Sequence, residues 1–371
     1  MQTDKEYMQL ALSLASSAKG NTNPNPLVGA VLVKNGVIVG TGLHRKAGEP
    51  HAEVHAFNMA GEHAKGATLY VTLEPCSHFG KTPPCANLVK DSGVARVVVA
   101  MEDPNPNVAG RGIKLLRDAG IEVEVGVMRE EAYRVNERFI HNMLTNRPFI
   151  VSKFAMTLDG KIATASGHSQ WVTGEVARAD VHELRHEIDG ILVGVGTVLK
   201  DNPMLTTRLA DGRVGKHPTR IILDSKLQTP LYSHVANTEI APTIIVTSME
   251  AQERKAQALE AQGVKIIRVA RLETGLELEE VLHILYAEGI TDLLVEGGGE
   301  VNASFLRAGL IDKYFIYIAP KILGGAHSIT PFGGSDVEMM DAALAVDFAG
   351  VDSFGDDLRI TAYPKKGEVR A

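Results

Sequence analysis

Apolar side chains in the first part of the chain alternate between helical spacing and strand spacing. Met8, Leu12 and Ala15 recur at helical intervals and predict a helix over residues 5–18. An Asn-Gly pair at 35–36 lies between two apolar runs and favours a tight hairpin turn. On the same reasoning we expect strands at 27–33, 37–41, 67–73, 95–101 and 121–125, and helices at 50–64, 86–91, 113–119 and 129–144.

A second alternating series begins after the Asn-Arg-Pro sequence at 146–148. Its expected strands are 149–155, 190–195, 219–224, 243–247, 265–269, 293–295 and 314–319, and its expected helices are 175–186, 251–261, 276–287 and 301–308. Strands that alternate with helices predict an open, largely parallel sheet with helices on both faces. We therefore expect an α/β protein of two domains, residues 1–146 and 147–371.

Length and composition agree with two globular domains and exclude several classes of protein. A chain of 371 residues corresponds to two or three domains at about 150 residues each. With 44% hydrophobic and 22% charged residues, a disordered or fibrous protein is excluded. The net charge is −7, and residues 1–146 carry 15 acidic and 15 basic side chains. Neither a nucleic acid nor an anionic membrane is therefore an expected partner.

The sequence shows no pattern of export or membrane insertion. Its first residues, Met-Gln-Thr-Asp-Lys-Glu, lack the basic and apolar order of a signal peptide. No apolar run approaches the roughly 20 residues of a membrane-spanning helix. In a reducing compartment, Cys76 and Cys85 are better interpreted as metal-binding or reactive thiols than as a disulfide. The expected location is the cytoplasm.

One histidine and both cysteines have the spacing of a catalytic zinc site. His51, Cys76 and Cys85 supply three ligands and leave the fourth tetrahedral position to water. Zinc lowers the pKa of a bound water to ~7, and Glu53, two residues after the histidine, can move protons. The alternative is a buried histidine, two buried cysteines and a solvated glutamate. The combination, which uses every cysteine of the chain, favours a zinc site with Glu53 as its catalytic residue.

The pattern departs in one respect from the signature of zinc nucleobase deaminases. That signature is His-x-Glu followed by Pro-Cys-x-x-Cys, whereas eight residues separate the cysteines here. Each proposed ligand directly follows a proline, which suits the first turn of a helix. We therefore expect all three ligands at helix starts, where the positive helix end also favours thiolates. His51 and Glu53 reach one metal only if it lies over the helix end, because residues two apart diverge on a regular helix.

The segment 74–85, Glu-Pro-Cys-Ser-His-Phe-Gly-Lys-Thr-Pro-Pro-Cys, resembles the deaminase half of the bifunctional riboflavin-biosynthesis deaminase/reductase family. That family has the eight-residue gap, and segments 23–29 and 103–112 are similar to it as well. The resemblance covers 1–146 and implies a cytidine-deaminase-like α/β/α domain. The implied substrate is a diaminopyrimidinone with a phosphoribosylamino group, which loses its 2-amino group with Glu53 as the proton carrier. Implied contacts to ring and phosphate are Asn25, His44, His78, Lys81 and Asn105.

Two glycine-rich strand ends in the second half favour a phosphate-containing ligand. Residues 193–197 read Val-Gly-Val-Gly-Thr, and residues 295–299 read Val-Glu-Gly-Gly-Gly before a predicted helix. Glycines between a strand and a helix let backbone N–H groups approach a phosphate, although a tight turn explains each cluster equally well. Neither cluster is the Gly-x-Gly-x-x-Gly fingerprint of dinucleotide-binding folds.

The segment 152–161, Ser-Lys-Phe-Ala-Met-Thr-Leu-Asp-Gly-Lys, resembles the opening of the reductase of the same family, which has the dihydrofolate-reductase fold. Similar segments follow at 194–197, 201–208, 223–225, 296–299 and 319–325. The resemblance implies hydride transfer from NADPH to the first ribose carbon, with Lys153 or Asp201 giving the ring oxygen its proton. Implied NADPH contacts are Ala155, Trp171, Thr197, Asp201, Ser225, Gly298, Gly299, Glu300, Val301, Asn302, Ala303 and Ser304. Implied substrate contacts are Ser169, Arg185, Leu205, Arg208 and Glu296.

The leading hypothesis is a two-domain riboflavin-biosynthesis enzyme that uses one zinc ion per deaminase domain and NADPH. It acts on a small phosphoribosyl pyrimidine, and the resemblance implies a homodimer formed through the reductase half. One alternative keeps the deaminase and makes residues 147–371 a non-catalytic module that senses a nucleotide. A second alternative is a base deaminase that acts on polynucleotides, which needs a basic face that the neutral residues 1–146 do not supply.

Overall fold

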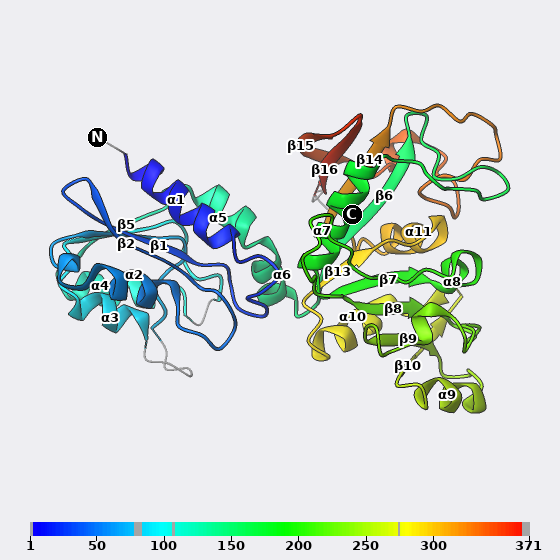
Figure 1. Cartoon of the computed structure of the whole chain (residues 1–371), viewed down its shortest axis with the longest axis horizontal. Coiled ribbons are helices and arrows are strands. Elements are labelled where there is room, and N and C mark those ends of the chain that lie inside the picture. Colours follow the sequence, from blue (N-terminus) through cyan, green and yellow to red (C-terminus); the bar gives the residue numbers. More distant parts are fainter. Residues whose placement is uncertain (1–2, 78–83, 106–107, 274, 366–371) are drawn as a thin grey trace. The chain divides into compact units, whose positions relative to one another are not determined.

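The computed structural model describes residues 3–77, 84–105, 108–273 and 275–365. The chain divides into two compact units, Met1–Asn146 and Arg147–Ala371, called unit 1 and unit 2 below. Each unit has a sheet of its own (Figure 1). Each also has its own clusters of buried hydrophobic side chains. Among the described residues, no helix is long and apolar enough to cross a membrane.

Unit 1 is built on a five-stranded sheet in the order β2-β1-β3-β4-β5. Its strands are β1 (Gly29–Lys34), β2 (Val37–Leu43), β3 (Thr68–Val71), β4 (Arg96–Val99) and β5 (Glu122–Val125). Its helices are α1 (Asp4–Ser16), α2 (Ala52–Ala60), the 3-10 helix η1 (Gly61–Ala64), α3 (Cys85–Asp91), α4 (Arg111–Asp118), α5 (Arg129–Val135) and α6 (Glu137–Thr145). β1 pairs antiparallel with β2 and β3, whereas β3, β4 and β5 are parallel. Helices α1 and α5 cover one face of the sheet and α2, α3 and α4 the other (Figure 1).

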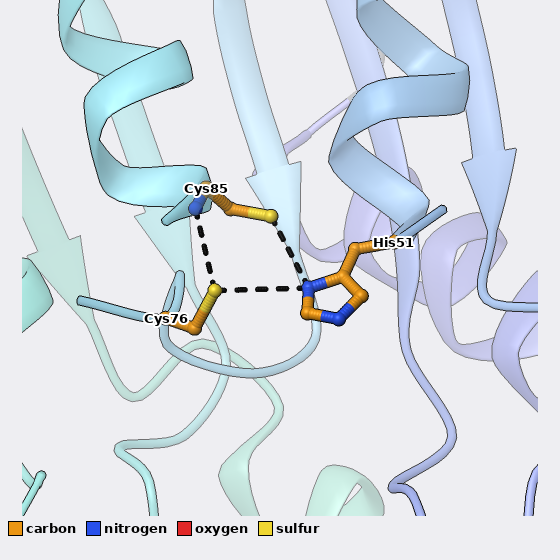
Figure 2. Close-up of side chains that lie close together, drawn as sticks. All are labelled: His51, Cys76 and Cys85. Atoms are coloured by element: carbon orange, nitrogen blue, oxygen red, sulfur yellow. Dashed lines mark hydrogen bonds between the residues drawn. The ribbon is translucent and has the colours of Figure 1, made fainter. Parts of the chain in front are cut away.

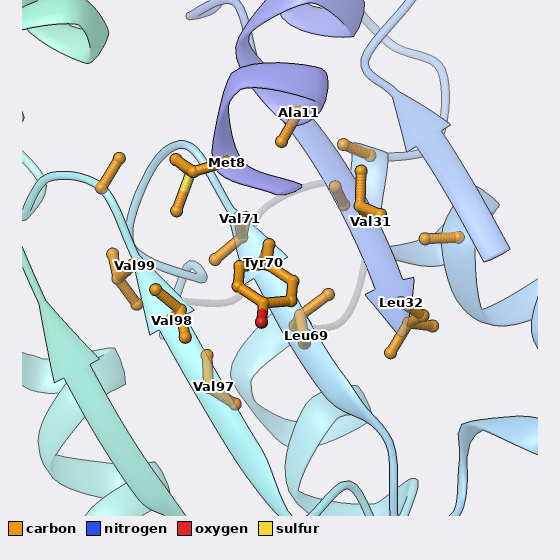
Figure 3. Packing of buried hydrophobic residues seen from close by; sticks show 14 of the residues in the cluster. Met8, Ala11, Val31, Leu32, Leu69, Tyr70, Val71, Val97, Val98 and Val99 are labelled. Carbon is orange, nitrogen blue, oxygen red and sulfur yellow. The ribbon is translucent and has the colours of Figure 1, made fainter. Parts of the chain in front are cut away.

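Buried apolar side chains hold helix α1 against the sheet of unit 1. Met8 and Ala11 of α1 belong to one buried cluster with Val31, Leu69 and Val98 of the sheet (Figure 3). Such burial stabilises a fold by about 25 cal/mol per Å² of apolar surface. Because β3 and β4 are parallel neighbours, the segments that leave their carboxyl ends begin side by side, as ligand-binding loops do in α/β sheets.

Unit 2 is built on a nine-stranded sheet in the order β10-β9-β8-β7-β13-β6-β14-β16-β15. Its strands are β6 (Phe149–Thr157), β7 (Gly190–Gly194), β8 (Thr219–Leu223), β9 (Thr243–Ser248), β10 (Lys265–Val269), β13 (Asp292–Val295), β14 (Lys313–Ala319), β15 (Val346–Phe354) and β16 (Asp357–Pro364). Its α-helices are α7 (Glu175–Glu187), α8 (Val195–Asp201), α9 (Glu253–Glu260), α10 (Leu278–Ala287) and α11 (Gly299–Arg307). Smaller elements are the ribbon of β11 (Arg271–Leu272) and β12 (Gly275–Leu276) and the 3-10 helices η2 (His234–Ala236) and η3 (Met340–Ala342).

The central strands of unit 2 are buried on both faces. Leu192 and Ile221 belong to the cluster that includes α10 and α11, and their neighbours Ile191 and Ile222 belong to the cluster that includes α8 and α9. Strands buried on both faces are typical of parallel sheets covered by helices. All neighbouring strands from β10 to β14 in this order pair parallel, and only the pairings of β16 with β14 and with β15 are antiparallel. The predicted open, largely parallel sheet is confirmed.

Other predicted elements differ from the structure. The expected helix over 129–144 is two helices, α5 and α6, which meet at Asn136. The side-chain amide of Asn136 accepts from the N–H of Leu27 (2.8 Å) and donates to the carbonyl of Leu27 (3.0 Å). The helix is interrupted at the residue that makes these two hydrogen bonds. Helix α8 and the β15–β16 hairpin were not predicted. Only Val198 of α8 is buried, and β15 is mostly exposed, so neither has a strong apolar pattern.

Candidate active sites

Three possible metal ligands lie together in unit 1. Nδ1 of His51 is 3.2 Å from Sγ of Cys85 and 3.7 Å from Sγ of Cys76 (Figure 2). The three ligand atoms all lie within 4.8 Å of one another. A tetrahedral zinc ion, with Zn–S near 2.3 Å and Zn–N near 2.0 Å, separates its ligand atoms by roughly 3.6 Å. The donor set and its spacing therefore fit zinc.

Two of the three ligands lie at helix starts. His51 is the N-cap residue of α2, with an extended backbone, and Cys85 is the first residue of α3. The same expectation for Cys76 is wrong, because Cys76 lies in the irregular segment after β3. The N–H of Cys85 donates to the Cys76 sulfur (3.3 Å), and the N–H of Ala86 donates to the Cys76 carbonyl (3.1 Å). Cys76 is thus bound to the start of α3 without being part of a helix.

Glu53 lies in the first turn of α2 and is 3% exposed. It lines the same cavity, of about 300 Å³, as His51 and Cys76. The cavity therefore lies over the start of α2. In this arrangement His51 and Glu53, which are two residues apart, can both reach one metal. Burial raises the pKa of Glu53 to about 7, and the nearby Cys76 thiolate contributes to the rise. A carboxyl group with this pKa can accept and return a proton near neutral pH.

The two thiols differ in acidity. The pKa of Cys76 is lowered because Cys85 and His51 donate hydrogen bonds to its sulfur. The pKa of Cys85 is raised because it is the donor in that contact and is buried. The hydrogen bond to Cys76 also raises the pKa of His51. A metal that binds both sulfurs as thiolates must release the remaining proton, so metal affinity at this site rises with pH.

Residues implied as substrate contacts hold one another at the wall of the cavity. Nε2 of His44, a residue 2% exposed, lies 3.1 Å from Nδ2 of Asn25, and Nδ1 lies 3.2 Å from the carbonyl of Pro50. An amide donor at Nε2 and a carbonyl acceptor at Nδ1 select one tautomer of the neutral ring. Asn25, His44 and Asn105 all line the cavity. Two further implied contacts, His78 and Lys81, lie outside the described residues.

A cavity of about 430 Å³ in unit 2 is rich in basic side chains. Two of them, Arg185 and Lys153, pair with the buried carboxylate of Glu296. Arg185 donates from Nε (3.0 Å) and Nη2 (2.9 Å), and Lys153 Nζ lies 3.4 Å from Oε2. Burial alone raises the pKa of Glu296, but the charges of Arg185 and Lys153 outweigh it and lower the pKa to about 2. The carboxylate stays ionised and holds both cations beside the cavity.

Two basic residues of this cavity, Arg178 and His182, were not predicted as site residues. With Arg185 they occupy positions i, i+4 and i+7 of α7 and so share one face of the helix. Nδ1 of His182 accepts from the N–H of Arg208 (3.2 Å), and burial together with Arg185 and Arg208 lowers its pKa to about 4. The Arg178 guanidinium lies 4.5 Å from the Trp171 ring centroid. Helical spacing of these basic residues was the signal that could have identified them.

The other implied substrate contacts do not line this cavity with their side chains. Ser169 is exposed, and Leu205 is 5% exposed within the core of unit 2. Leu205 has a positive φ of 53°, an uncommon conformation for a branched residue. Leu205 can therefore offer only its backbone to a ligand.

The implied NADPH contacts are divided among several places in unit 2. Four of them, Ser225, Glu300, Val301 and Ser304, line a second cavity of about 600 Å³ at the end of β8 and along α11. Gly298 is the N-cap of α11. A Cβ on Gly299 would lie 3.2 Å from the backbone of Thr330 and of Gly333, so a larger residue is disfavoured there.

The remaining implied NADPH contacts are separate from this second cavity. Trp171 lines the first cavity of unit 2 and is 62% exposed. Asn302 and Ala303 are buried in α11, and Asn302 donates to the carbonyl of Pro331 (3.0 Å). Ala155 lies in β6, and Thr197 and Asp201 lie in α8, with Asp201 exposed.

Two family models match different parts of the chain. Residues 1–101 match the cytidine and deoxycytidylate deaminase zinc-binding region, and residues 148–360 match the RibD C-terminal domain. The riboflavin biosynthesis protein RibD of Aquifex aeolicus is 50% identical over 357 residues, which cover 96% of this chain and 97% of that protein. RibD of Bacillus amyloliquefaciens is 48% identical over 366 residues, which cover 98% and 97%.

Solved structures of similar proteins match both units together. The Acinetobacter baumannii RibD structure, form 1, has a TM-score of 0.85 and 38% identity, and the match covers 98% of this chain and 99% of that chain. A Thermotoga maritima diaminohydroxyphosphoribosylaminopyrimidine deaminase/5-amino-6-(5-phosphoribosylamino)uracil reductase has a TM-score of 0.84 and 39% identity, covering 97% and 98%. Matches over the whole chain favour neither a nucleotide-sensing second half nor a deaminase of polynucleotides. The chain belongs to the RibD family of bifunctional riboflavin-biosynthesis enzymes, which join a zinc-dependent deaminase to an NADPH-dependent reductase.

Proposed function

We propose that the two reactions are divided between the two units and that the residues described above carry them. Unit 1 deaminates 2,5-diamino-6-(5-phosphoribosylamino)pyrimidin-4-one, and unit 2 reduces the ribosyl group of the product with NADPH to give 5-amino-6-(5-phosphoribitylamino)uracil. The observation that carries the first assignment is the grouping of three ligand atoms within 4.8 Å beside the buried Glu53. The second rests on the basic cavity around Lys153 and Arg185.

In unit 1, Glu53 is the proposed proton carrier. His51, Cys76 and Cys85 would hold a zinc ion, which would make a bound water acidic enough to attack at neutral pH. Oxygen adds to the ring carbon that bears the 2-amino group, the carbon–nitrogen bond breaks, and ammonia leaves. Glu53 takes one proton of the water and delivers it to the ring nitrogen, and then takes the second proton from the added oxygen and delivers it to the departing amine. Its raised pKa and its burial both suit this exchange.

In unit 2, Lys153 is the proposed proton donor. Hydride adds to the first ribose carbon, the bond from that carbon to the ring oxygen breaks, and the oxygen takes a proton. Lys153 lines the cavity, and its Nζ lies 3.4 Å from Oε2 of Glu296, which holds the amine beside the cavity. Asp201, the other candidate, is exposed at the last turn of α8. We assign the substrate phosphate to Arg208 and Arg178, because the Arg185 guanidinium is already paired with Glu296.

The finer statements on assembly and location are also proposals. We propose a homodimer formed through unit 2, because β15 is the edge strand of its sheet and carries exposed apolar side chains at Phe348 and Val351. Light scattering of the full chain tests this, and a monomer at micromolar concentration would contradict it. We further propose that the enzyme works in the cytoplasm, the compartment in which Cys76 and Cys85 stay reduced.

Mass spectrometry of the pyrimidine ribotide tests the division of labour. Purified protein without NADPH should give the deaminated product, and addition of NADPH should add two hydrogens to it. Accumulation of the deaminated product that NADPH leaves unchanged would contradict the reductase assignment. No reaction in zinc-loaded protein would contradict the substrate itself.

A further inference from the structure

Glu74 is a buried carboxylate whose hydrogen bonds all reach one loop. It lies two residues before Cys76 and is 5% exposed. Oε1 accepts from the N–H of Gly112 (2.7 Å) and of Ile113 (3.2 Å). Oε2 accepts from the N–H of Gly110 (2.9 Å) and of Asp103 (3.2 Å). One side chain thus gathers four backbone donors, one from Asp103 and three from residues 110–113.

The same loop forms a wall of the zinc cavity. Asp103, Asn105 and Val108 line that cavity together with His51 and Cys76. Residues 101–105 belong to no helix or strand, so no ladder of backbone hydrogen bonds holds them. The N–H of Asn105 donates to Oδ1 of Asp103 (2.9 Å), which ties the position of Asn105 to that of Asp103. What fixes Asp103 therefore also fixes Asn105.

The start of α4 touches the peptide that precedes Cys76. A Cβ built on Gly112 would lie 2.1 Å from the carbonyl oxygen of Pro75 and 3.2 Å from Oε1 of Glu74. The backbone at Gly112 is therefore in direct contact with Pro75, one residue from a proposed zinc ligand. Any residue larger than glycine has to push the loop and the ligand segment apart.

We propose that Glu74 is a positioning residue of the deaminase: it fixes the distance from the zinc-ligand segment to residues 103–105 and 110–113 and thereby sets the affinity of the cavity for the pyrimidine substrate. A carboxylate suits this role because its two oxygens have room for about four hydrogen bonds, and all four contacts here are backbone N–H donors. A glutamine would turn two N–H donors toward backbone N–H groups. The inference rests on the proposed deamination in unit 1 and adds a residue that does not itself touch the reacting atoms.

The test compares Glu74→Gln with Glu102→Gln in the full-length, zinc-loaded enzyme. Glu102 lies next to Asp103 but is exposed, so its substitution changes the same side chain to an amide and leaves the four hydrogen bonds of Glu74 in place. We expect Glu74→Gln to raise the KM of deamination roughly 10- to 100-fold, the effect of a displacement near 1 Å in a reacting site, with a smaller change in kcat. Zinc content and the rate of the reductase, measured on the deaminated intermediate, should match those of Glu102→Gln.

A second variant moves the loop without altering the carboxylate. Gly112→Ala keeps Glu74 and should also raise the KM of deamination, because its Cβ displaces the loop from Pro75. If Glu74→Gln does not fold, Gly112→Ala decides the question. An unchanged KM in the folded variants, or a loss of zinc in proportion to the loss of activity, overturns the inference. Absence of deamination in the unaltered enzyme would instead contradict the proposed function of unit 1.

Discussion

Glu53 of unit 1 and Glu296 of unit 2 are both buried carboxylates, yet their surroundings give them opposite acidities. Burial raises the pKa of Glu53 to about 7. The same burial acts on Glu296, but Arg185 and Lys153 outweigh it and bring its pKa down to about 2. The first group can exchange a proton near neutral pH, and the second is a permanent anion. One residue type is thereby suited to acid–base chemistry at one site and to holding cations at the other.

The difference between the two sites lies in what compensates the buried charge. In unit 1 the proposed ligands His51, Cys76 and Cys85 offer thiols and an imidazole to a metal, so the cation would come from outside the chain. In unit 2 the chain supplies its own cations, and Arg185 meets Glu296 through two hydrogen bonds. Loss of the carboxylate should therefore stop proton transfer in unit 1, whereas in unit 2 it should leave buried cations unpaired.

The largest expected effect is that of Glu53→Gln, which keeps the shape of the side chain and removes its ability to carry a proton. We expect deamination to fall by roughly a thousandfold, within the range for loss of a general acid–base group. Reduction of the deaminated intermediate and zinc content should stay as in the unaltered enzyme, which makes the second activity an internal control. Deamination that persists above a tenth of its original rate would contradict the role of Glu53.

Glu296→Gln should have a different and smaller effect on its own reaction. Arg185 and Lys153 would lose their partner, and breaking a buried ion pair from one side costs about 3–5 kcal/mol. We expect a lower unfolding temperature for unit 2 and a fall in kcat/KM of reduction of roughly 10- to 100-fold, with deamination unchanged. The exposed pair of Glu183 and Arg213 provides the control, because Glu183→Gln should change stability by less than about 1 kcal/mol. Equal losses of stability in the two variants would contradict the expected difference between the buried and the exposed ion pair.

The zinc site could be predicted from the sequence because its chemistry is concentrated in a few residue types. His51, Cys76 and Cys85 lie within 35 consecutive positions, and few other functions use two cysteines and a histidine at such spacing. What the sequence did not indicate was Glu74, because a carboxylate that binds backbone N–H groups has no partner side chain to mark it. The position of Cys76 outside a helix was missed for a similar reason, since its contacts are with the backbone of α3.

The reductase site depended far more on resemblance. Lys153, Arg185, Arg208 and Glu296 lie on separate elements, and only the order of strands brings Lys153 beside Glu296. Apolar periodicity predicted most strands and helices of unit 2, because their buried faces are continuous. It failed for α8 and for the β15–β16 hairpin, where few side chains are buried. Pairing of charges across a sheet is a tertiary property that local pattern does not encode.

Stability should depend on pH in opposite directions for the two buried glutamates. In zinc-free protein the raised pKa of Glu53 favours its neutral form, so its contribution is present below pH 4.5 and is lost as the pH rises towards 7. For Glu296 the pKa is lowered, so its contribution is present above pH 4.5 and is lost as the pH falls towards 2. We expect each change to amount to at most about 3 kcal/mol. The difference in urea unfolding between the unaltered zinc-free protein and Glu53→Gln, measured from pH 4.5 to 7.5, isolates the first change, because other groups with shifted pKa values, such as His182, titrate in both proteins. An unaltered pH dependence in that variant would exclude Glu53 as its source.

The smallest expected effect concerns Lys321, a cation at the rim of the reductase site that is held by carbonyl groups instead of a carboxylate. Nζ of Lys321 donates to the carbonyls of Trp171 and Val172, each at 2.8 Å. The backbone carbonyl of Lys321 accepts from the N–H of Leu158. Because Trp171 is 62% exposed, burial contributes little to holding its ring, and these bonds must do so together with the contact to Arg178. Exposed bonds of this kind contribute about 1 kcal/mol, so Lys321→Met should raise the KM for NADPH roughly fivefold.

Trp171 also reports on its own position, because it is the only tryptophan in the chain. Its emission should be quenched when NADPH binds, and Lys321→Met should need a higher NADPH concentration for the same quenching. Lys255→Met, a substitution on α9, provides the control. If Lys321→Met leaves both the emission and the KM for NADPH unchanged, the backbone of the Trp171 loop holds the ring without the lysine. The contrast between the buried and exposed charges of unit 2 would then be sharper still, because an exposed lysine held by carbonyl oxygens would contribute nothing measurable where the buried cations paired with Glu296 do.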